Sequence, residues 1–90
     1  MLYTPAMRLQ VDEIRVPANF EVDIVEYNMH PKFIALRFYE SHWRHFNDAE
    51  RLKCIKYLTR VKQIIEAHGV NVTLEPIYDA YNENKHNYFS

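Results

Sequence analysis

Two histidines that stand three residues apart are the first candidates for chemistry in this sequence. His42 and His45 flank Trp43 and Arg44, and on a helix they would share a face, as two ligands of one metal ion must. On a strand they would point to opposite sides, and no spacing in the chain selects a third ligand. We therefore expect surface histidines, or a loop before a helix that packs Trp43 and Phe46 into the core, and no bound metal.

Cysteine and serine do not predict an enzyme either. Cys54, the one cysteine, falls among apolar residues at helical spacing, which is typical of a buried thiol rather than a reactive thiolate. Serine occurs at positions 41 and 90 without a Gly-x-Ser-x-Gly motif, and a chain with one glycine cannot contain a P-loop or a dinucleotide-binding fingerprint. We expect a non-enzymatic protein with no cofactor.

Basic residues are concentrated in the middle of the chain. Residues 31–68 hold eight Lys or Arg and four Asp or Glu, whereas the rest of the chain is net acidic. Lys53, Lys56 and Arg60 fall within about 60° of one another on a helical wheel, so they form a ridge that could contact an anionic partner. The alternative is an ordinary solvated face, in which Glu50 pairs with Lys53 and acidic strands neutralise a basic helix.

An apolar strip beside these cations points to a protein partner. Leu52 lies opposite the main apolar stripe of the same predicted helix, not far from Ile55, and a partner or a second copy could cover such a strip. Trp43 and Arg37 belong to residue types that are enriched at interfaces. An ordinary exposed leucine is the alternative. The predicted partner-binding residues are Trp43, Arg44, Leu52, Lys53, Lys56 and Arg60.

The first element that must position these residues is expected near the N-terminus. Met7, Leu9 and Val11 alternate with polar residues, and the alternation resumes after a slip of one position at residues 12–13. A period of two is typical of a strand with one buried face, and the slip is typical of a bulge. The pattern therefore predicts a bulged strand over about residues 7–16.

Residues 20–27 and 33–39 predict two further strands. In the first of these, apolar residues alternate with Glu21 and Asp23, so that one face of the strand is acidic. The second segment is also compatible with a helix that runs to Phe46, but its aromatic residues favour a strand.

The segment from about Asp48 to His68 predicts a long helix. Asn47 precedes it and Glu50 follows three positions later, which is a capping-box pattern. Gly69 stands where a left-handed residue would end the helix. The residues that share its apolar stripe are Cys54, Tyr57, Leu58, Val61, Ile64 and Ile65.

A last strand is expected directly after this helix. Apolar and polar residues alternate over 70–74, and Pro76 is expected to end the strand. Residues 82–90 show no periodicity and predict a flexible tail behind a single domain of residues 1–81. The predicted fold class is α+β, with a small antiparallel sheet in β-β-β-α-β order and one long amphipathic helix packed on one face. The other face is expected to be wet or covered by another chain.

Composition restricts the class of protein further. Ninety residues suit one domain, and a hydrophobic fraction of 48 % with 14 % aromatic residues argues against disorder. No apolar run approaches the length of a membrane span, and the start of the sequence lacks a secretory-signal pattern. Together with the single cysteine, these features predict a protein of the reducing cytoplasm.

We therefore predict a small protein-binding, regulatory module, an inhibitor or adaptor that occludes or bridges a partner protein and could form a homodimer. Its size and near absence of glycine would suit a viral or mobile-element accessory protein. The alternative is a small nucleic-acid-binding regulator that combines the basic helix face with stacking by Phe33, Phe38 or Tyr39. A sequence pI near 6.5 is low for that alternative.

Overall fold

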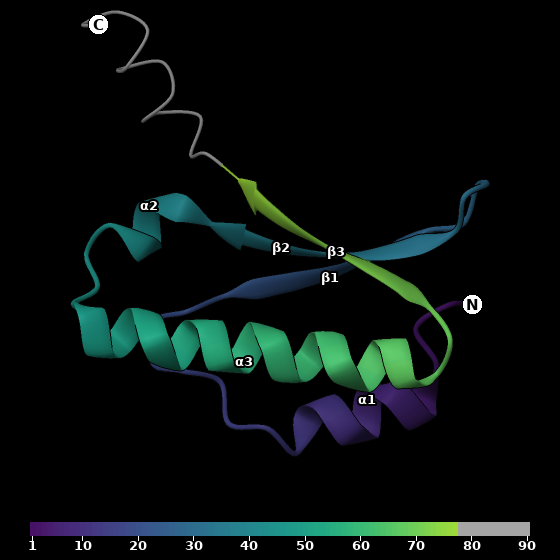
Figure 1. Ribbon diagram of the computed structural model, residues 1–90, viewed down its shortest axis with the longest axis horizontal. Helices are drawn as coiled ribbons and strands as arrows, with labels where there is room; N and C mark the ends of the chain where they lie inside the picture. Colours follow the sequence, from purple (N-terminus) through teal and green to yellow (C-terminus); the bar gives the residue numbers. More distant parts are fainter. Residues whose placement is uncertain (78–90) are drawn as a thin grey trace, which may run out of the picture.

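The computed structural model describes residues 1–77, apart from the side chains of residues 41 and 42. The end of the predicted domain and the predicted tail lie outside the described residues. The elements are α1 (Pro5–Asp12), β1 (Val22–Tyr27), β2 (Phe33–Tyr39), α2 (Glu40–Trp43), α3 (Asp48–Ala67) and β3 (Asn71–Ile77). Figure 1 shows the three strands as one layer, with α1 and α3 together on one side of it. The predicted α+β class is confirmed, whereas the predicted order is wrong at its start.

The first predicted strand is a helix, α1. The Thr4 hydroxyl accepts a hydrogen bond from the N–H of Met7 (3.3 Å), and Pro5 lies in the first turn, where its missing N–H costs nothing. Met7 and Val11 lie about one turn apart and are 2 % and 4 % exposed, whereas Leu9 between them is 69 % exposed. The strand prediction fails because the alternating apolar residues include Met7 and Val11, which are four residues apart and also share one face of a helix. The cap and the core contacts select the helical period.

The sheet is mixed, with β2 between β1 and β3. β1 pairs antiparallel with β2, so that Tyr27 lies opposite Phe33, whereas β3 pairs parallel with β2. The prediction of an antiparallel sheet is therefore wrong for β3. The 20-residue helix α3 spans about 30 Å, which is longer than a strand. It therefore carries the chain back to the end of the sheet where β2 begins, so that β3 runs parallel to β2.

The structure also settles the segment after the β1–β2 turn. Phe33–Tyr39 is a strand, as preferred, and the alternative helix to Phe46 is limited to the single turn of α2. β3 continues to Ile77, past its expected end at Pro76. Proline is tolerated there because β3 is an edge strand, where one side of the backbone has no partner in the sheet.

The predicted long helix is confirmed as α3, together with its capping box. The Asn47 side chain accepts a hydrogen bond from the N–H of Glu50 (2.8 Å), and the Glu50 carboxylate accepts one from the N–H of Asn47 (3.0 Å). After the helix, Gly69 adopts a φ of +81°, a conformation that L side chains rarely take, so glycine is required to turn the chain into β3.

The core lies between the helices and one face of the sheet. Ile34 and Leu36 on β2 are fully buried against the apolar stripe of α3, whose buried members are Cys54, Tyr57, Leu58, Val61 and Ile65. Phe20 stands at the centre of an aromatic cluster, with ring centroids 6.0 to 6.5 Å from those of Phe38, Trp43, Phe46 and Tyr57. Within residues 1–77, none of the helices combines the length and hydrophobicity that a bilayer crossing requires.

Candidate functional site

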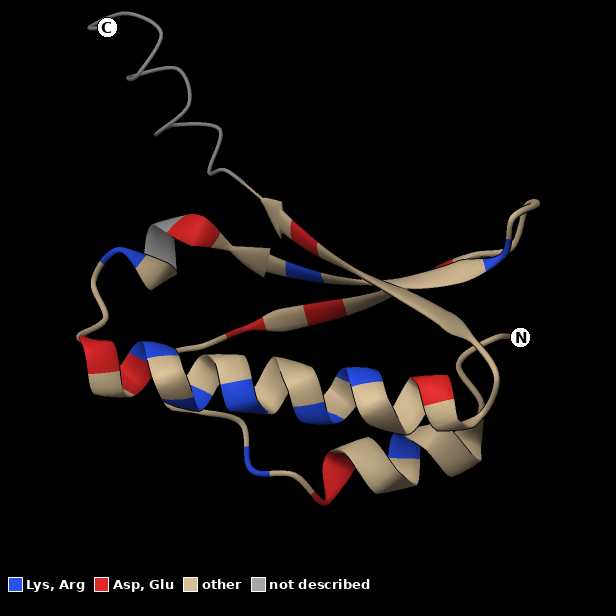
Figure 2. Cartoon of the chain, in the orientation of Figure 1, with Lys and Arg blue, Asp and Glu red and all other residues tan. Residues whose placement is uncertain are grey.

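The solvent-exposed side of α3 brings together four of the six predicted partner-binding residues. Leu52 is 51 % exposed and Ile55 is 47 % exposed, and the cations beside them are exposed as well. Figure 2 shows basic positions along much of this helix, whereas β1 carries acidic ones. We call this surface the α3 face and define it by Leu52, Lys53, Ile55, Lys56 and Arg60.

The cations of the α3 face are not neutralised within the described chain. Among residues 1–77, the ion pair is that of Arg37 with Glu75, whose Nε and Oε1 atoms lie 3.6 Å apart. Glu50 does not pair with Lys53, because its carboxylate is used in the capping box of α3. The Glu50–Lys53 pair that the solvated-face alternative included is therefore absent, and the exposed cations are left to solvent.

The other two predicted residues lie at the end of α2 and directly after it. Trp43 is half-buried and contacts the rings of Phe20 and Phe38, and its carbonyl oxygen accepts a hydrogen bond from Nε of Arg51 (3.3 Å). Arg44 follows it and is exposed. Phe46 is in the core and Trp43 packs against it, as expected, but Trp43 ends α2 instead of lying in a loop. The Trp43 ring thus faces the core and not the α3 face.

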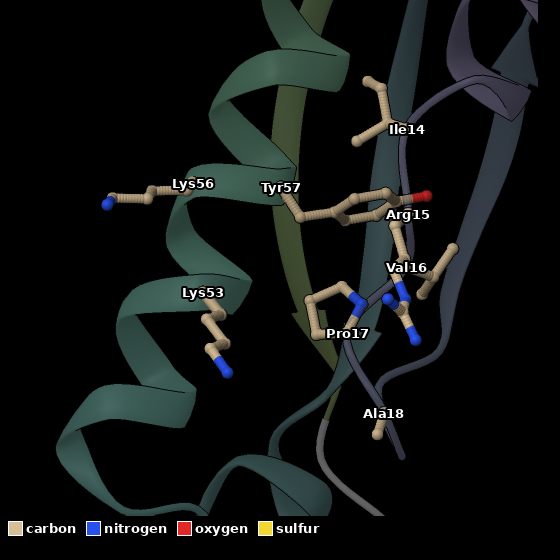
Figure 3. Close-up of a pocket in the computed structure, with 8 residues that line it drawn as sticks. All are labelled: Ile14, Arg15, Val16, Pro17, Ala18, Lys53, Lys56 and Tyr57. Carbon is tan, nitrogen blue, oxygen red and sulfur yellow. The ribbon is translucent and has the colours of Figure 1, made fainter.

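A cleft of about 620 Å³ opens between α3 and the linker from α1 to β1. Its lining residues are Ile14, Arg15, Val16, Pro17, Ala18, Lys53, Lys56 and Tyr57. Figure 3 shows the Tyr57 ring reaching from α3 across to the linker, while Lys53 leans toward Pro17 and Lys56 extends away from it. The lining contains three cations and no carboxylate. Its size falls in the range of ligand-binding clefts.

The linker that forms one wall of this cleft is anchored at both ends. The N–H of Ile14 donates to the carbonyl oxygen of Val11 (3.0 Å), and the N–H of Phe20 donates to that of Pro17 (3.2 Å). The Phe20 side chain is only 3 % exposed, so it holds the end of the linker in the core. Between these anchors, the backbone N–H groups of Arg15 and Val16 have no partner within the described chain.

Two titratable groups on the inner side of α3 have raised pKa values. Burial, aided by the negative charge of Asp12, raises the pKa of the Tyr57 phenol further above its ordinary value, so it is a neutral hydroxyl well beyond neutral pH. Burial and the charge of Glu50 raise the pKa of the Cys54 thiol, which is fully enclosed. The prediction that Cys54 is buried is confirmed. The cleft therefore offers cations and a neutral hydroxyl, which can hold an anion.

The residues that the sequence suggested as metal ligands or as base-stacking rings do not line this cleft. His45 is exposed, and the described residues contain no group of three His, Cys, Asp or Glu side chains that could hold a metal ion. Of the strand aromatics proposed to stack on bases, Phe38 packs against the core, and Phe33 is stacked on Tyr27 with ring centroids 4.5 Å apart.

Sequence reasoning missed Arg15 and the linker wall. The alternation predicts a strand that includes Arg15, and nothing local distinguishes a strand from an extended linker of the same residues. The signal that was available is Pro17 with Asn19, a pair typical of loops. Asn19 does adopt a φ of +63°.

Comparisons with family models, with curated proteins and with solved structures found no match for this chain. The function is therefore inferred from the arrangement of its own residues.

Proposed function

We propose that this chain is a non-enzymatic protein-binding module that covers an acidic surface of a partner protein with its α3 face. The observation that carries the proposal is the juxtaposition of unpaired Lys53, Lys56 and Arg60 with exposed Leu52 and Ile55. Interfaces commonly join an apolar anchor to charged groups that steer the partner and set its orientation. By covering such a surface, the module would occlude or bridge its partner.

The scaffold of the α3 face supports this role. α3 is capped at its N-terminus and held by a continuous buried stripe, so its exposed side chains project from a rigid backbone. A rigid backbone loses little conformational entropy on association, which leaves more of the contact energy for affinity. A cytoplasmic setting is part of the proposal, because the one cysteine is a buried free thiol.

A nucleic-acid-binding regulator is the second candidate, and the same unpaired cations favour it. It has less support from the rest of the molecule. Two of the three rings it would use are engaged within the chain, since Phe33 stacks on Tyr27 and Phe38 packs against the core. The net charge of −1 also opposes binding to a polyanion.

Site-specific photocrosslinking tests the proposal. A benzophenone amino acid replaces Leu52 in one variant and Leu9, an exposed leucine of α1, in the matched control. After irradiation in a lysate of the cells that express the protein, we expect a discrete protein adduct from position 52 and not from position 9. Adding Lys56→Glu and Arg60→Glu to the first variant is expected to abolish that adduct.

Other outcomes separate the alternatives. An adduct of twice 10.9 kDa would identify a second copy as the occupant of the α3 face. Equal adducts from positions 52 and 9 would overturn the proposal. A labelled single-stranded oligonucleotide that binds with steep salt dependence, and is released by the double charge reversal, would favour the second candidate instead.

A further inference from the structure

We infer that the cleft between α3 and the α1–β1 linker receives an acidic peptide segment of the partner, with one large apolar side chain seated between carboxylates. This inference rests on the proposed function and specifies the chemistry of the partner. It follows from the lining of the cleft, its backbone groups and its continuity with the α3 face.

The lining divides into an apolar part and a cationic part. In Figure 3, Pro17 lies toward the nearly buried ring of Tyr57 and Ala18 lies farther along the linker, so the lining includes an apolar part that can accept an aliphatic or aromatic side chain. Arg15 and Lys53 flank it from opposite walls, and the lining holds no carboxylate that would neutralise them. Cations on both sides of an apolar contact favour a partner that carries acidic residues on both sides of its apolar anchor.

The linker wall favours a peptide over an isolated small anion. The N–H groups of Arg15 and Val16 donate no hydrogen bond within the described residues, so they are available to carbonyl or carboxylate oxygens of an extended chain. Lys53 and Lys56 belong both to the cleft and to the α3 face. A segment seated in the cleft would therefore continue directly onto the surface proposed to cover the partner.

The two acidic side chains that act on Tyr57 and Cys54 do not line the cleft. Asp12 acts electrostatically on Tyr57 but does not line the cavity, and Glu50 is held at the N-terminus of α3 by its bond to Asn47. The cations of the lining thus have no competing intramolecular partner in the described part of the chain.

A titration of the full-length, 15N-labelled protein tests the inference with a defined probe. The probe is the acetylated and amidated peptide Glu-Glu-Leu-Glu-Glu, followed by 1H–15N correlation spectra. We expect saturable shifts of the amide signals of residues 14–18 and 53–57. Glu-Glu-Ser-Glu-Glu, which lacks the apolar anchor, is expected to bind at least about fivefold more weakly. Lys-Lys-Leu-Lys-Lys is expected to cause no shift.

Three variants locate the binding site. Lys53→Glu is expected to weaken binding at least about fivefold, because it reverses a cation that faces the cleft. Lys32→Glu makes the same charge change in the exposed β1–β2 turn and is expected to alter binding by no more than about twofold. Ala18→Trp fills the cleft without a change of charge and is expected to abolish the shifts over residues 53–57.

The outcomes distinguish this inference from the proposed function. Shifts that do not saturate, equal binding of the leucine and serine peptides, or equal losses in Lys53→Glu and Lys32→Glu would overturn the cleft as a binding site. If the crosslink from position 52 then persists, the α3 face still binds a partner without the cleft. If both experiments fail, the proposed function fails with the inference.

Discussion

The outer face of the sheet and the α3 face are both exposed to solvent, yet they leave their side chains in different states. On the sheet, Arg37 pairs with Glu75, and the Tyr27 and Phe33 rings stack nearly parallel, with an interplanar angle of 10°. On the α3 face, Lys53 and its neighbouring cations have no ion pair in the described chain, and Leu52 has no apolar cover. The sheet surface thus pairs some of its charged and aromatic groups with one another, whereas the cations and Leu52 of the α3 face are exposed to solvent and available to a partner.

The largest effect is expected from the layer that supports both faces. Leu36 is fully buried on β2 and lies between the sheet and α3. We expect Leu36→Ala to lower the free energy of unfolding by about 3 kcal/mol, through lost burial and the cavity left behind. Urea unfolding followed by circular dichroism measures this change. A loss below about 1 kcal/mol would mean that the two faces do not share this core.

The next largest effect is expected from Asn47, whose side chain and backbone hold Glu50 away from Lys53. Asn47→Ala removes one half of the capping box and is expected to cost about 1 kcal/mol of stability, measured by the same unfolding curves. The change also frees Glu50 to approach Lys53, so we expect binding of Glu-Glu-Leu-Glu-Glu to weaken. Glu50→Gln in the Asn47→Ala background should restore that binding. Failure of this rescue would show that Glu50 does not compete for the cleft.

A smaller effect compares charge reversals on the two faces. Arg37→Glu places a carboxylate between Asp23 and Glu75 on neighbouring strands, and we expect it to lower stability by at most about 1 kcal/mol because the site is partly exposed. Arg60→Glu is expected to change stability by less than about 0.5 kcal/mol. Thermal unfolding of the two variants side by side measures the difference. Equal losses would remove the distinction between a paired and an unpaired surface.

The smallest effect is expected from the phenol beneath the α3 face. The folded state raises the pKa of Tyr57 above its ordinary value near 10, so the folded protein keeps its proton where the unfolded chain releases it. Stability should therefore be unaffected by this group below pH 10 and should fall as the pH rises above it. Tyr57→Phe is expected to make the decline shallower in pH-dependent unfolding. An unchanged slope would mean that Tyr57 is not the group responsible.

Local patterns in the sequence were sufficient for α3 and β1, and they favoured β2 over a helix. The capping box needs only Asn47 and Glu50, which are three residues apart, and the apolar stripe repeats within the same helix. The N-terminal helix was not predictable in this way. Met7 and Val11 fit a strand or a helix equally well, and the choice depends on the Thr4 cap and on packing against α3.

The candidate site also combines features that local sequence predicts with features that depend on tertiary contacts. The sequence alone determined which residues would make a capped amphipathic helix with cations on its exposed side, because such signals act over one or two turns of chain. Only the tertiary structure decided that β3 runs parallel to β2 and that Arg15 lies across a cleft from Lys53. These features depend on contacts between residues distant in sequence, whose geometry is set by the shared core and not by local propensity.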